Sequence, residues 1–184
     1  MPTQHAARGT EVLVAFASRH GATRGVAERI AARLDDEGLV VTLGAVEDVT
    51  EIPPGAAVVL GSPVYDGRWP PEFDAFVERH LRTLVSRPVW LFSVGTFGDT
   101  RRAIGALMLR EPRNIADVRD ALRPRDYRVF AGVILRHQWP PPSRLLFHAF
   151  GGRFGDNRDW PAIEGWAEAI ARELTRSPEP AETR

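Results

Sequence analysis

Strand-like and helix-like segments alternate along the chain, and this alternation limits the possible folds more than any single motif does. Residues 11–17, EVLVAFA, are apolar and β-branched on both faces, as expected for a strand buried between two layers of helices. Val26, Ile30 and Leu34 then recur at four-residue steps, which predicts a helix that ends at Gly38. Further strands are predicted at 39–44, 56–61, 88–95 and 128–135, and further helices at 71–85, 115–122 and, capped by Asp159, 159–175.

Five strands that alternate with helices predict an α/β fold. We expect a doubly wound five-stranded parallel sheet of order 2-1-3-4-5, with helices on both faces in three layers. In such sheets the ligand crevice lies outside the carboxyl ends of the strands, beside the first and third strands. The functional residues are therefore expected in three loops, at 18–23, 62–70 and 95–100. At 184 residues the chain suits one domain, expected at 11–176, with disordered tails at 1–10 and 177–184.

Composition excludes several classes of function. The 24 basic residues are all arginine and are balanced by 24 acidic ones, so no overall basic field attracts nucleic acid. Cysteine is absent, and the five histidines lack metal-ligand spacing, so we expect neither thiolate chemistry nor a bound metal. Ser93 lacks the first glycine of a nucleophile elbow. No apolar run approaches the roughly 20 residues of a membrane span, and the N-terminal residues lack the apolar core of a signal peptide, so we expect a cytoplasmic protein.

The turn after the first strand, SRHGAT at 18–23, combines hydroxyl side chains with a glycine. Ser18 and Thr23 can donate to an anion, and Gly21 allows close approach of the backbone. The first N–H groups of the following helix point their partial positive charge at the same place. The turn therefore predicts a site for one phosphate monoester, held by neutral donors. The alternative is that Ser18 and Thr23 only cap the helix.

Other anion-binding and signalling sites on this topology require residues that the chain lacks. A P-loop needs a lysine, and the chain has none. A dinucleotide site needs G-x-G-x-x-G, but here only Gly21 and Gly25 are present, after the bulky Arg19 and His20. A receiver domain needs an aspartate at the end of the third strand, where this chain has Ser62, and a lysine after the fifth.

These motifs together resemble a known family. SRHGAT at 18–23 resembles the phosphate loop of flavodoxins, and GSPVYDGRWPPEFDAFV at 61–77 resembles their second flavin loop. The span from 11 to 175 resembles the flavodoxin-domain branch that includes the menaquinone-dependent protoporphyrinogen oxidases. The resemblance implies an FMN-dependent oxidoreductase or electron-transfer protein in which no side chain does acid–base chemistry. Its partner would be a quinone, a porphyrinogen or a redox partner protein. Because Arg19 and His20 replace small hydroxyl residues, the alternative is a binding or regulatory module that has lost flavin.

The resemblance also assigns roles around the flavin ring. Tyr65 is the better candidate to stack on the ring and Trp69 the second, unless Trp69 only packs at the start of the next helix. A redox-linked peptide flip is expected near Asp66 and Gly67. In the third loop, backbone amides would face the pyrimidine edge, Phe97 would stack, and Asp99 would either accept from the flavin or cap a helix. The complete predicted set is Ser18, Arg19, His20, Gly21, Ala22, Thr23, Pro63, Val64, Tyr65, Asp66, Gly67, Gly95, Thr96, Phe97, Gly98 and Asp99.

Two further segments have open interpretations. Residues 136–158 exceed an ordinary connection, and they form a lip over the flavin, a quinone-facing or peripheral membrane surface, a homodimer contact, or a cover for the sheet. Arginines near the third loop either receive an anionic substrate or partner or form a solvated surface; they are Arg101, Arg102, Arg110 and Arg113.

Overall fold

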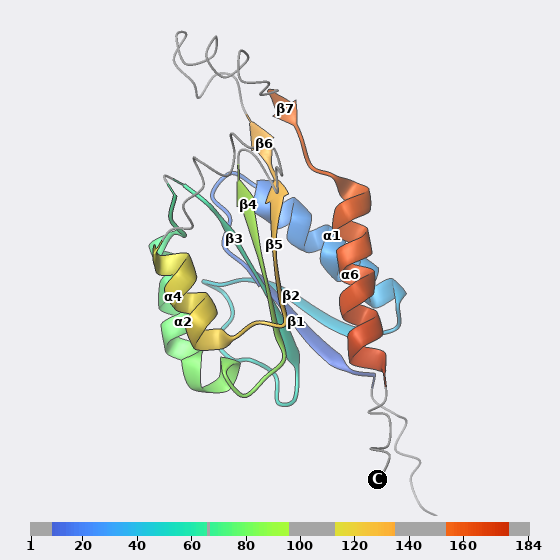
Figure 1. The fold of residues 1–184 in the computed structure, drawn as a ribbon. Helices are drawn as coiled ribbons and strands as arrows, with labels where there is room; N and C mark the ends of the chain where they lie inside the picture. The colour runs from blue at the N-terminus through green and yellow to red at the C-terminus, as the bar shows by residue number, and fades with distance from the viewer. Residues whose placement is uncertain (1–8, 66, 96–112, 135–153, 177–184) are drawn as a thin grey trace, which may run out of the picture.

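A computed structural model describes residues 9–65, 67–95, 113–134 and 154–176 (Figure 1). Its main sheet has five parallel strands in the order β2-β1-β3-β4-β5, which confirms the predicted α/β topology. The strands are β1 (Glu11–Phe16), β2 (Val40–Ala45), β3 (Ala57–Pro63), β4 (Val89–Gly95) and β5 (Asp126–Ala131). Helices α1 (Ala22–Asp36) and α6 (Trp160–Thr175) cover one face of the sheet, and α2 (Pro71–Leu84) and α4 (Arg113–Leu122) cover the other.

The register of the strands brings their carboxyl ends to one edge of the sheet. Phe16 of β1 pairs with Gly61 of β3, and Ser62 of β3 pairs with Ser93 of β4. Pairing continues one residue beyond the strands, because the Val64 N–H donates to the Val94 carbonyl at 2.9 Å. The turns after β1, β3 and β4 therefore leave the same edge, as the sequence predicted.

Each face of the sheet has its own apolar core. Val26, Ile30 and Leu34 of α1 are fully buried against one face, in the helical stripe that the sequence predicted. On the other face Phe73 and Phe76 of α2 are buried.

The apolar stripe of α2 differs from the prediction at one position. The sequence pattern of the 71–85 helix predicts a buried stripe of Phe73, Phe76, Val77, Leu81 and Leu84, but Leu81 is 38% exposed. His80 takes the inner position instead, with its ring 4.6 Å from that of Phe76. The stripe follows steps of four from Phe76 through His80 to Leu84, so the helical geometry favoured the less apolar residue.

The fifth strand is shorter and earlier than predicted. The sequence indicated 128–135, but β5 ends at Ala131 and the next residues form β6 (Val133–Ile134), which pairs antiparallel with β7 (Gly155–Asp156). The chain leaves the sheet at Gly132, whose N–H donates to the Gly95 carbonyl at 2.8 Å. A Cβ at this position would lie 2.9 Å from Val94 Cγ1, so the close approach requires glycine.

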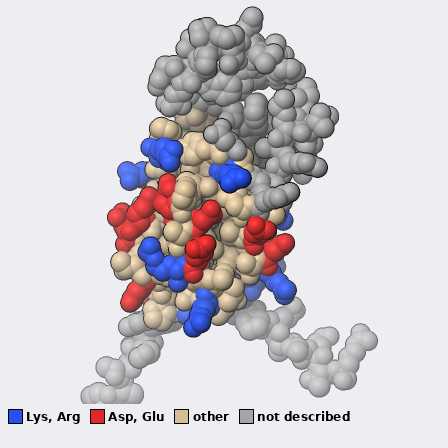
Figure 2. Space-filling model, turned by 90° about the vertical axis from the view of Figure 1, so that its left-hand side faces the viewer, with Lys and Arg blue, Asp and Glu red and all other residues tan. Residues whose placement is uncertain are grey.

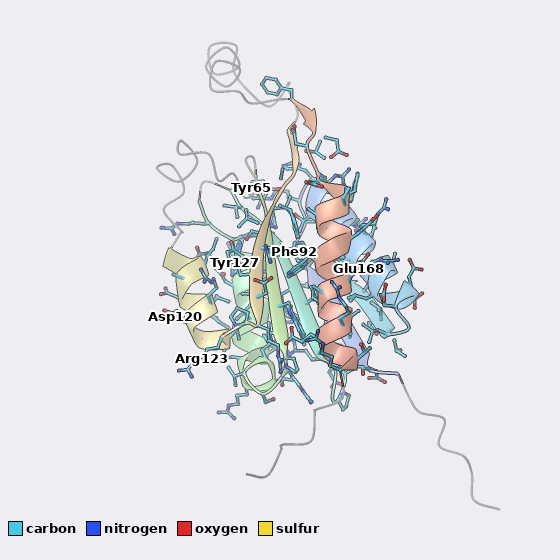
Figure 3. All side chains as sticks on the ribbon, turned by 45° about the vertical axis from the view of Figure 1, so that its right-hand side comes forward. Tyr65, Phe92, Asp120, Arg123, Tyr127 and Glu168 are labelled. Carbon is cyan, nitrogen blue, oxygen red and sulfur yellow. The ribbon has the colours of Figure 1, made fainter. Side chains whose placement is uncertain are left out.

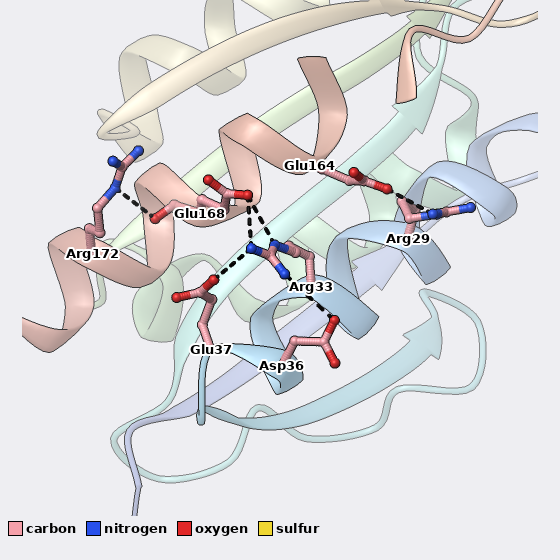
Figure 4. A network of polar contacts seen from close by, with 7 residues as sticks. All are labelled: Arg29, Arg33, Asp36, Glu37, Glu164, Glu168 and Arg172. Atoms are coloured by element: carbon pink, nitrogen blue, oxygen red, sulfur yellow. Dashed lines mark hydrogen bonds and ion pairs between the residues drawn. The ribbon is translucent and has the colours of Figure 1, made fainter. Parts of the chain in front are cut away.

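Helix α6 begins where the sequence predicted, and ion pairs join it to α1. The Asp159 side chain accepts a hydrogen bond from the Ala162 N–H at 3.1 Å, which is the expected cap. Ion pairs cross from α1 to α6, with Arg29 Nη1 2.7 Å from Glu164 and Arg33 Nη2 2.9 Å from Glu168 (Figure 4). These side chains are a third to a half exposed, so the pairs contribute little to stability.

Candidate functional site at the carboxyl edge of the sheet

The turn between β1 and α1 is organised by one hydroxyl group. Ser18 Oγ accepts hydrogen bonds from the N–H groups of Gly21 and Arg24, both at 3.2 Å. Ser18 thus satisfies two backbone donors at the start of α1, whose N-cap residue is Gly21. The N–H groups of Ala22 and Thr23, which lie between these two donors, bond to no acceptor within the part of the chain that the structure describes. Two donors in the first turn of α1 remain available to a ligand.

Gly21 gives this turn its shape. It precedes α1 with φ of +82°, a left-handed conformation that L side chains rarely adopt. A Cβ built on Gly21 would meet no heavy atom within 4 Å, so the space above the turn is open. Arg19 and His20 are exposed beside it, whereas Thr23 is 1% exposed and lies beneath the turn. The space beside Gly21 is therefore open, and the two free backbone donors of Ala22 and Thr23 lie in the same turn.

The turn after β3 is closed on itself and lies against the first. Tyr65 and Arg68 exchange backbone hydrogen bonds of 3.0 and 2.8 Å, and Gly67 between them has φ of +73°. The half-buried Tyr65 ring lies 5.4 Å below the Arg19 guanidinium and 6.0 Å from the His20 ring. Burial raises the Tyr65 pKa; Arg19 opposes that shift and Glu72 adds to it. The phenol therefore stays neutral at physiological pH.

Trp69 does not offer a surface for a flavin. It is 2% exposed, and its indole ring packs against Phe73 with 4.8 Å between ring centroids. Its Nε1 donates to Ser93 Oγ at 2.8 Å. The prediction that Trp69 is the second stacking residue is therefore wrong, and its alternative role at the start of α2 is confirmed.

The other predicted site residues divide into two groups. Pro63 is buried, and Val64 and Gly95 are half-buried at the carboxyl edge, so these three lie where the sequence placed them. Asp66, Thr96, Phe97, Gly98 and Asp99 lie outside the described residues, as do Arg101, Arg102 and Arg110 and most of the 136–158 segment. Arg113 is the first residue of α4.

Comparison with known proteins gives the family. A model of the flavodoxin domain matches residues 13–148, which include the first two turns and most of the sheet. The chain belongs to the flavodoxin domain family. FMN is the cofactor of this family, as the sequence resemblance implied. No curated protein matches the chain significantly.

Solved structures share the fold of this flavodoxin domain. A flavodoxin from the domain Archaea aligns over 91% of this chain and 100% of its own, with a TM-score of 0.58 and 14% identity. Oxidised flavodoxin 1 from Bacillus cereus aligns over 90% and 100%, with a TM-score of 0.60 and 13% identity. Rubredoxin oxygen:oxidoreductase from Desulfovibrio gigas aligns over 91% of this chain but only 37% of its own, with a TM-score of 0.58 and 16% identity. At these identities the likeness concerns the fold alone.

The first turn of the flavodoxin domain fits a phosphate ester. A dianion needs several donors and no adjacent carboxylate, and this turn offers the amides of Ala22 and Thr23 at the positive end of a 15-residue helix. The exposed side chains beside it, Arg19 and His20, are cationic or neutral. The Tyr65 ring belongs to the second turn and provides an aromatic surface beside the first turn.

β5 and α6 lie side by side (Figure 3), and residues of both line a separate groove of about 830 Å³. Trp90, Phe130 and Trp166 line its apolar floor, and Asp126 and Glu173 are among its polar residues. The described residues that line it include none of the predicted cofactor residues. The groove is therefore distinct from the carboxyl-edge site.

The surface of the flavodoxin domain shows no segregated charge on the face that carries α2 and α4. Arginine and acidic side chains are interspersed there (Figure 2), in line with the formal net charge of zero. Within the described part of the chain, no helix has the length and hydropathy needed to cross a membrane.

Proposed function

We propose that this flavodoxin domain binds FMN at the carboxyl edge of β1, β3 and β4 and works as an electron-transfer protein or oxidoreductase. The observation that carries the proposal is the meeting of the first two turns. The Tyr65 ring lies against Arg19 and His20 of the phosphate turn, so one ligand can reach both the free helix amides and an aromatic face.

Each part of the ligand has a matching group. The backbone N–H groups of Ala22 and Thr23 would hold the phosphate, with Ser18 keeping the turn in shape. The Thr23 hydroxyl, buried at the start of α1, would add a donor from within the turn. Neutral donors suit a dianion that must remain fully charged, because the helix dipole stabilises it without proton transfer. The Tyr65 ring covers the isoalloxazine and excludes water from it. When bound, FMN supplies the electron transfer itself.

The residues predicted for the polar edge of the flavin complete the proposal. Gly67, with its positive φ, would lie near the flavin N5, and Gly95 at the end of β4 would lie near the pyrimidine edge, as the sequence resemblance implies. No described side chain at the site is arranged for acid–base work, so the chain orients the cofactor and limits its access to water. The acceptor we propose to test first is a quinone, with protoporphyrinogen as donor, because the sequence resembles that branch of the family.

Binding of FMN to the purified full-length chain tests the proposal. Titration should quench FMN fluorescence, and Thr23→Val, which removes only the hydroxyl, should weaken binding about tenfold or more, since hydrogen bonds to charged groups are the strong ones. Ser86→Ala is the matched control, because Ser86 is exposed at the far end of α2, where its hydroxyl donates to the Thr83 carbonyl. Absence of quenching would support the alternative of a module without flavin, and equal affinity of Thr23→Val and the wild type would contradict the placement of the phosphate.

A further inference from the structure

We propose that Trp69, acting through Ser93, is the positioning residue that fixes the 65–68 turn on the sheet and so sets how FMN is held and at what potential it is reduced. The first half of this inference concerns the chain alone. The second half rests on the proposed function.

The position of the 65–68 turn depends on the contacts at its two ends. Its ends are closed by the paired backbone hydrogen bonds between Tyr65 and Arg68. The residues on either side, Val64 and Trp69, are the points where the turn meets the rest of the molecule. Tyr65 and Gly67 move with it, so its position decides where the aromatic surface lies relative to the phosphate turn.

The two flanking residues, Val64 and Trp69, both form hydrogen bonds to β4, at neighbouring positions of that strand. On the entry side, the Val64 N–H donates to the Val94 carbonyl at 2.9 Å. On the exit side, Trp69 Nε1 donates to Ser93 Oγ at 2.8 Å, in a place where Ser93 has no exposed surface and Trp69 is 2% exposed. Gly95, the start of the third loop, follows directly. The 65–68 turn is therefore held to the end of β4, where the predicted third loop begins.

Ser93 has a second donor, which provides an internal control. The Tyr127 hydroxyl, from β5, donates to the same Ser93 oxygen at 2.9 Å. Tyr127 is remote from the 65–68 turn in sequence, and its ring lies 6.4 Å from that of Trp69, edge to face. Removing the Tyr127 hydroxyl takes one hydrogen bond from Ser93 and leaves the hydrogen bond from Trp69 Nε1 in place.

Replacing Ser93 by alanine has a different consequence. The Trp69 N–H would then be buried without an acceptor, which is unfavourable enough to draw the indole toward water. Because Trp69 follows Arg68 directly, any movement of the indole moves the closed turn and Tyr65 with it. A hydroxyl that never touches the cofactor thus controls the flavin surface.

The experiment compares Ser93→Ala with Tyr127→Phe in the full chain. In the protein without FMN, amide hydrogen exchange at Tyr65 and Arg68 should be at least about tenfold faster in Ser93→Ala than in the wild type, since exchange reports local opening. It should be unchanged in Tyr127→Phe. With FMN, Ser93→Ala should bind about tenfold more weakly and show a shifted midpoint potential, while Tyr127→Phe keeps both wild-type values.

Ser93→Ala removes both hydrogen bonds to Ser93 Oγ, whereas Tyr127→Phe removes one, so Ser93→Ala should be the less stable variant in urea. Exchange at Tyr65 and Arg68 is therefore compared with exchange at core amides of the same variant, which separates local opening of the turn from a general loss of stability. If Ser93→Ala does not fold, Trp69→Phe serves instead, because it keeps an aromatic ring against Phe73 and removes the donor. The anchoring would be overturned if Tyr65 and Arg68 exchange at the wild-type rate in Ser93→Ala, or in Trp69→Phe where that variant replaces it. It would also be overturned if Tyr127→Phe accelerates exchange at these amides equally. If the exchange difference is found but wild-type protein takes up no FMN, the anchoring stands and the proposed function fails. If FMN binds with the same affinity and potential in wild type and Ser93→Ala, the proposed function stands and this inference fails.

Discussion

Gly61→Ala is predicted to destabilise the protein strongly, although it adds a single methyl group to a strand. A Cβ on Gly61 would lie 2.0 Å from Phe92 Cζ and 2.4 and 2.5 Å from the two Cε atoms. To reach an ordinary contact of 3.4 Å, the ring tip must retreat by about 1.4 Å, the difference between 3.4 and 2.0. Phe92 has no exposed surface, and its ring packs against Phe130 and Trp166 with 6.2 and 6.1 Å between ring centroids. These neighbours oppose the required displacement of the Phe92 ring.

The expected cost is about 3 kcal/mol, the upper part of the range for overpacked cores. In a chain of this size that lowers the melting temperature by roughly 6–12 °C. Urea denaturation measures the free energy directly. A second substitution identifies the cause: Phe92→Leu removes the three colliding ring atoms and alone costs about 1–2 kcal/mol. The double variant should then be more stable than the sum of the single effects by at least about 1 kcal/mol. A single variant within about 0.5 kcal/mol of the wild type, or additive effects in the double variant, would refute the steric argument.

Three smaller effects are also predicted. Asp159→Ala should lower the free energy of unfolding by about 1 kcal/mol in urea, because the Ala162 N–H loses its cap; no change would mean that the cap is replaced by water. Burial opposes the ionisation of Asp126, but hydrogen bonds from Arg128 and Trp166 outweigh it and hold the pKa of Asp126 below its ordinary value. Asp126 therefore adds stability that is present above about pH 4 and is lost as pH falls through the folded pKa, so acid titration of unfolding should show a drop that Asp126→Asn lacks. Arg33→Gln should lower the free energy of unfolding only slightly, and the loss should shrink in 1 M salt; a large, salt-independent loss would contradict screened surface pairs.

The fold was predictable because the apolar patterns of the strands, the spacing of apolar residues in the helices and the helix-capping residue all indicated the same arrangement. The run at 11–17 is apolar on both faces and is fully buried except near its start. The four-residue steps of α1 and the cap at Asp159 required only local chemistry, and both are found where expected. The exit of the chain at Gly132 was not predictable in the same way, because it depends on contact with Val94 in a neighbouring strand.

Side chains that combine a polar tip with an apolar body were the ones misjudged. The sequence left Trp69 between stacking on the flavin and packing at the start of α2, and its N–H donates to Ser93 in the core. Trp166 was not singled out, yet it is 6% exposed and donates to Asp126 at 2.9 Å, from the same helix whose apolar steps were recognised. In both cases the partner comes from a strand distant in sequence. A polar residue at a strand position such as Ser93 is a signal that could have indicated a buried hydrogen bond.

The candidate site was predictable in its location and less so in its details. The topology placed the three loops at one edge, and the meeting of Tyr65 with Arg19 and His20 agrees with that placement. The sequence left open whether Ser18 faces a ligand or caps the helix, and in the structure its oxygen accepts from the N–H groups of Gly21 and Arg24. A hydroxyl can satisfy local amides or a ligand, and only the three-dimensional arrangement decides between them.

A comparison of FMN with riboflavin as ligands of the wild-type chain tests the central claim most directly. The two molecules share the isoalloxazine and the ribityl chain and differ only in the phosphate. If the turn at 18–23 holds a phosphate through helix amides, fluorescence titration should show FMN binding at least about a hundredfold more tightly than riboflavin, since several charge-assisted hydrogen bonds are at stake. Equal affinity for both, or no binding of either, would contradict the assignment of that turn.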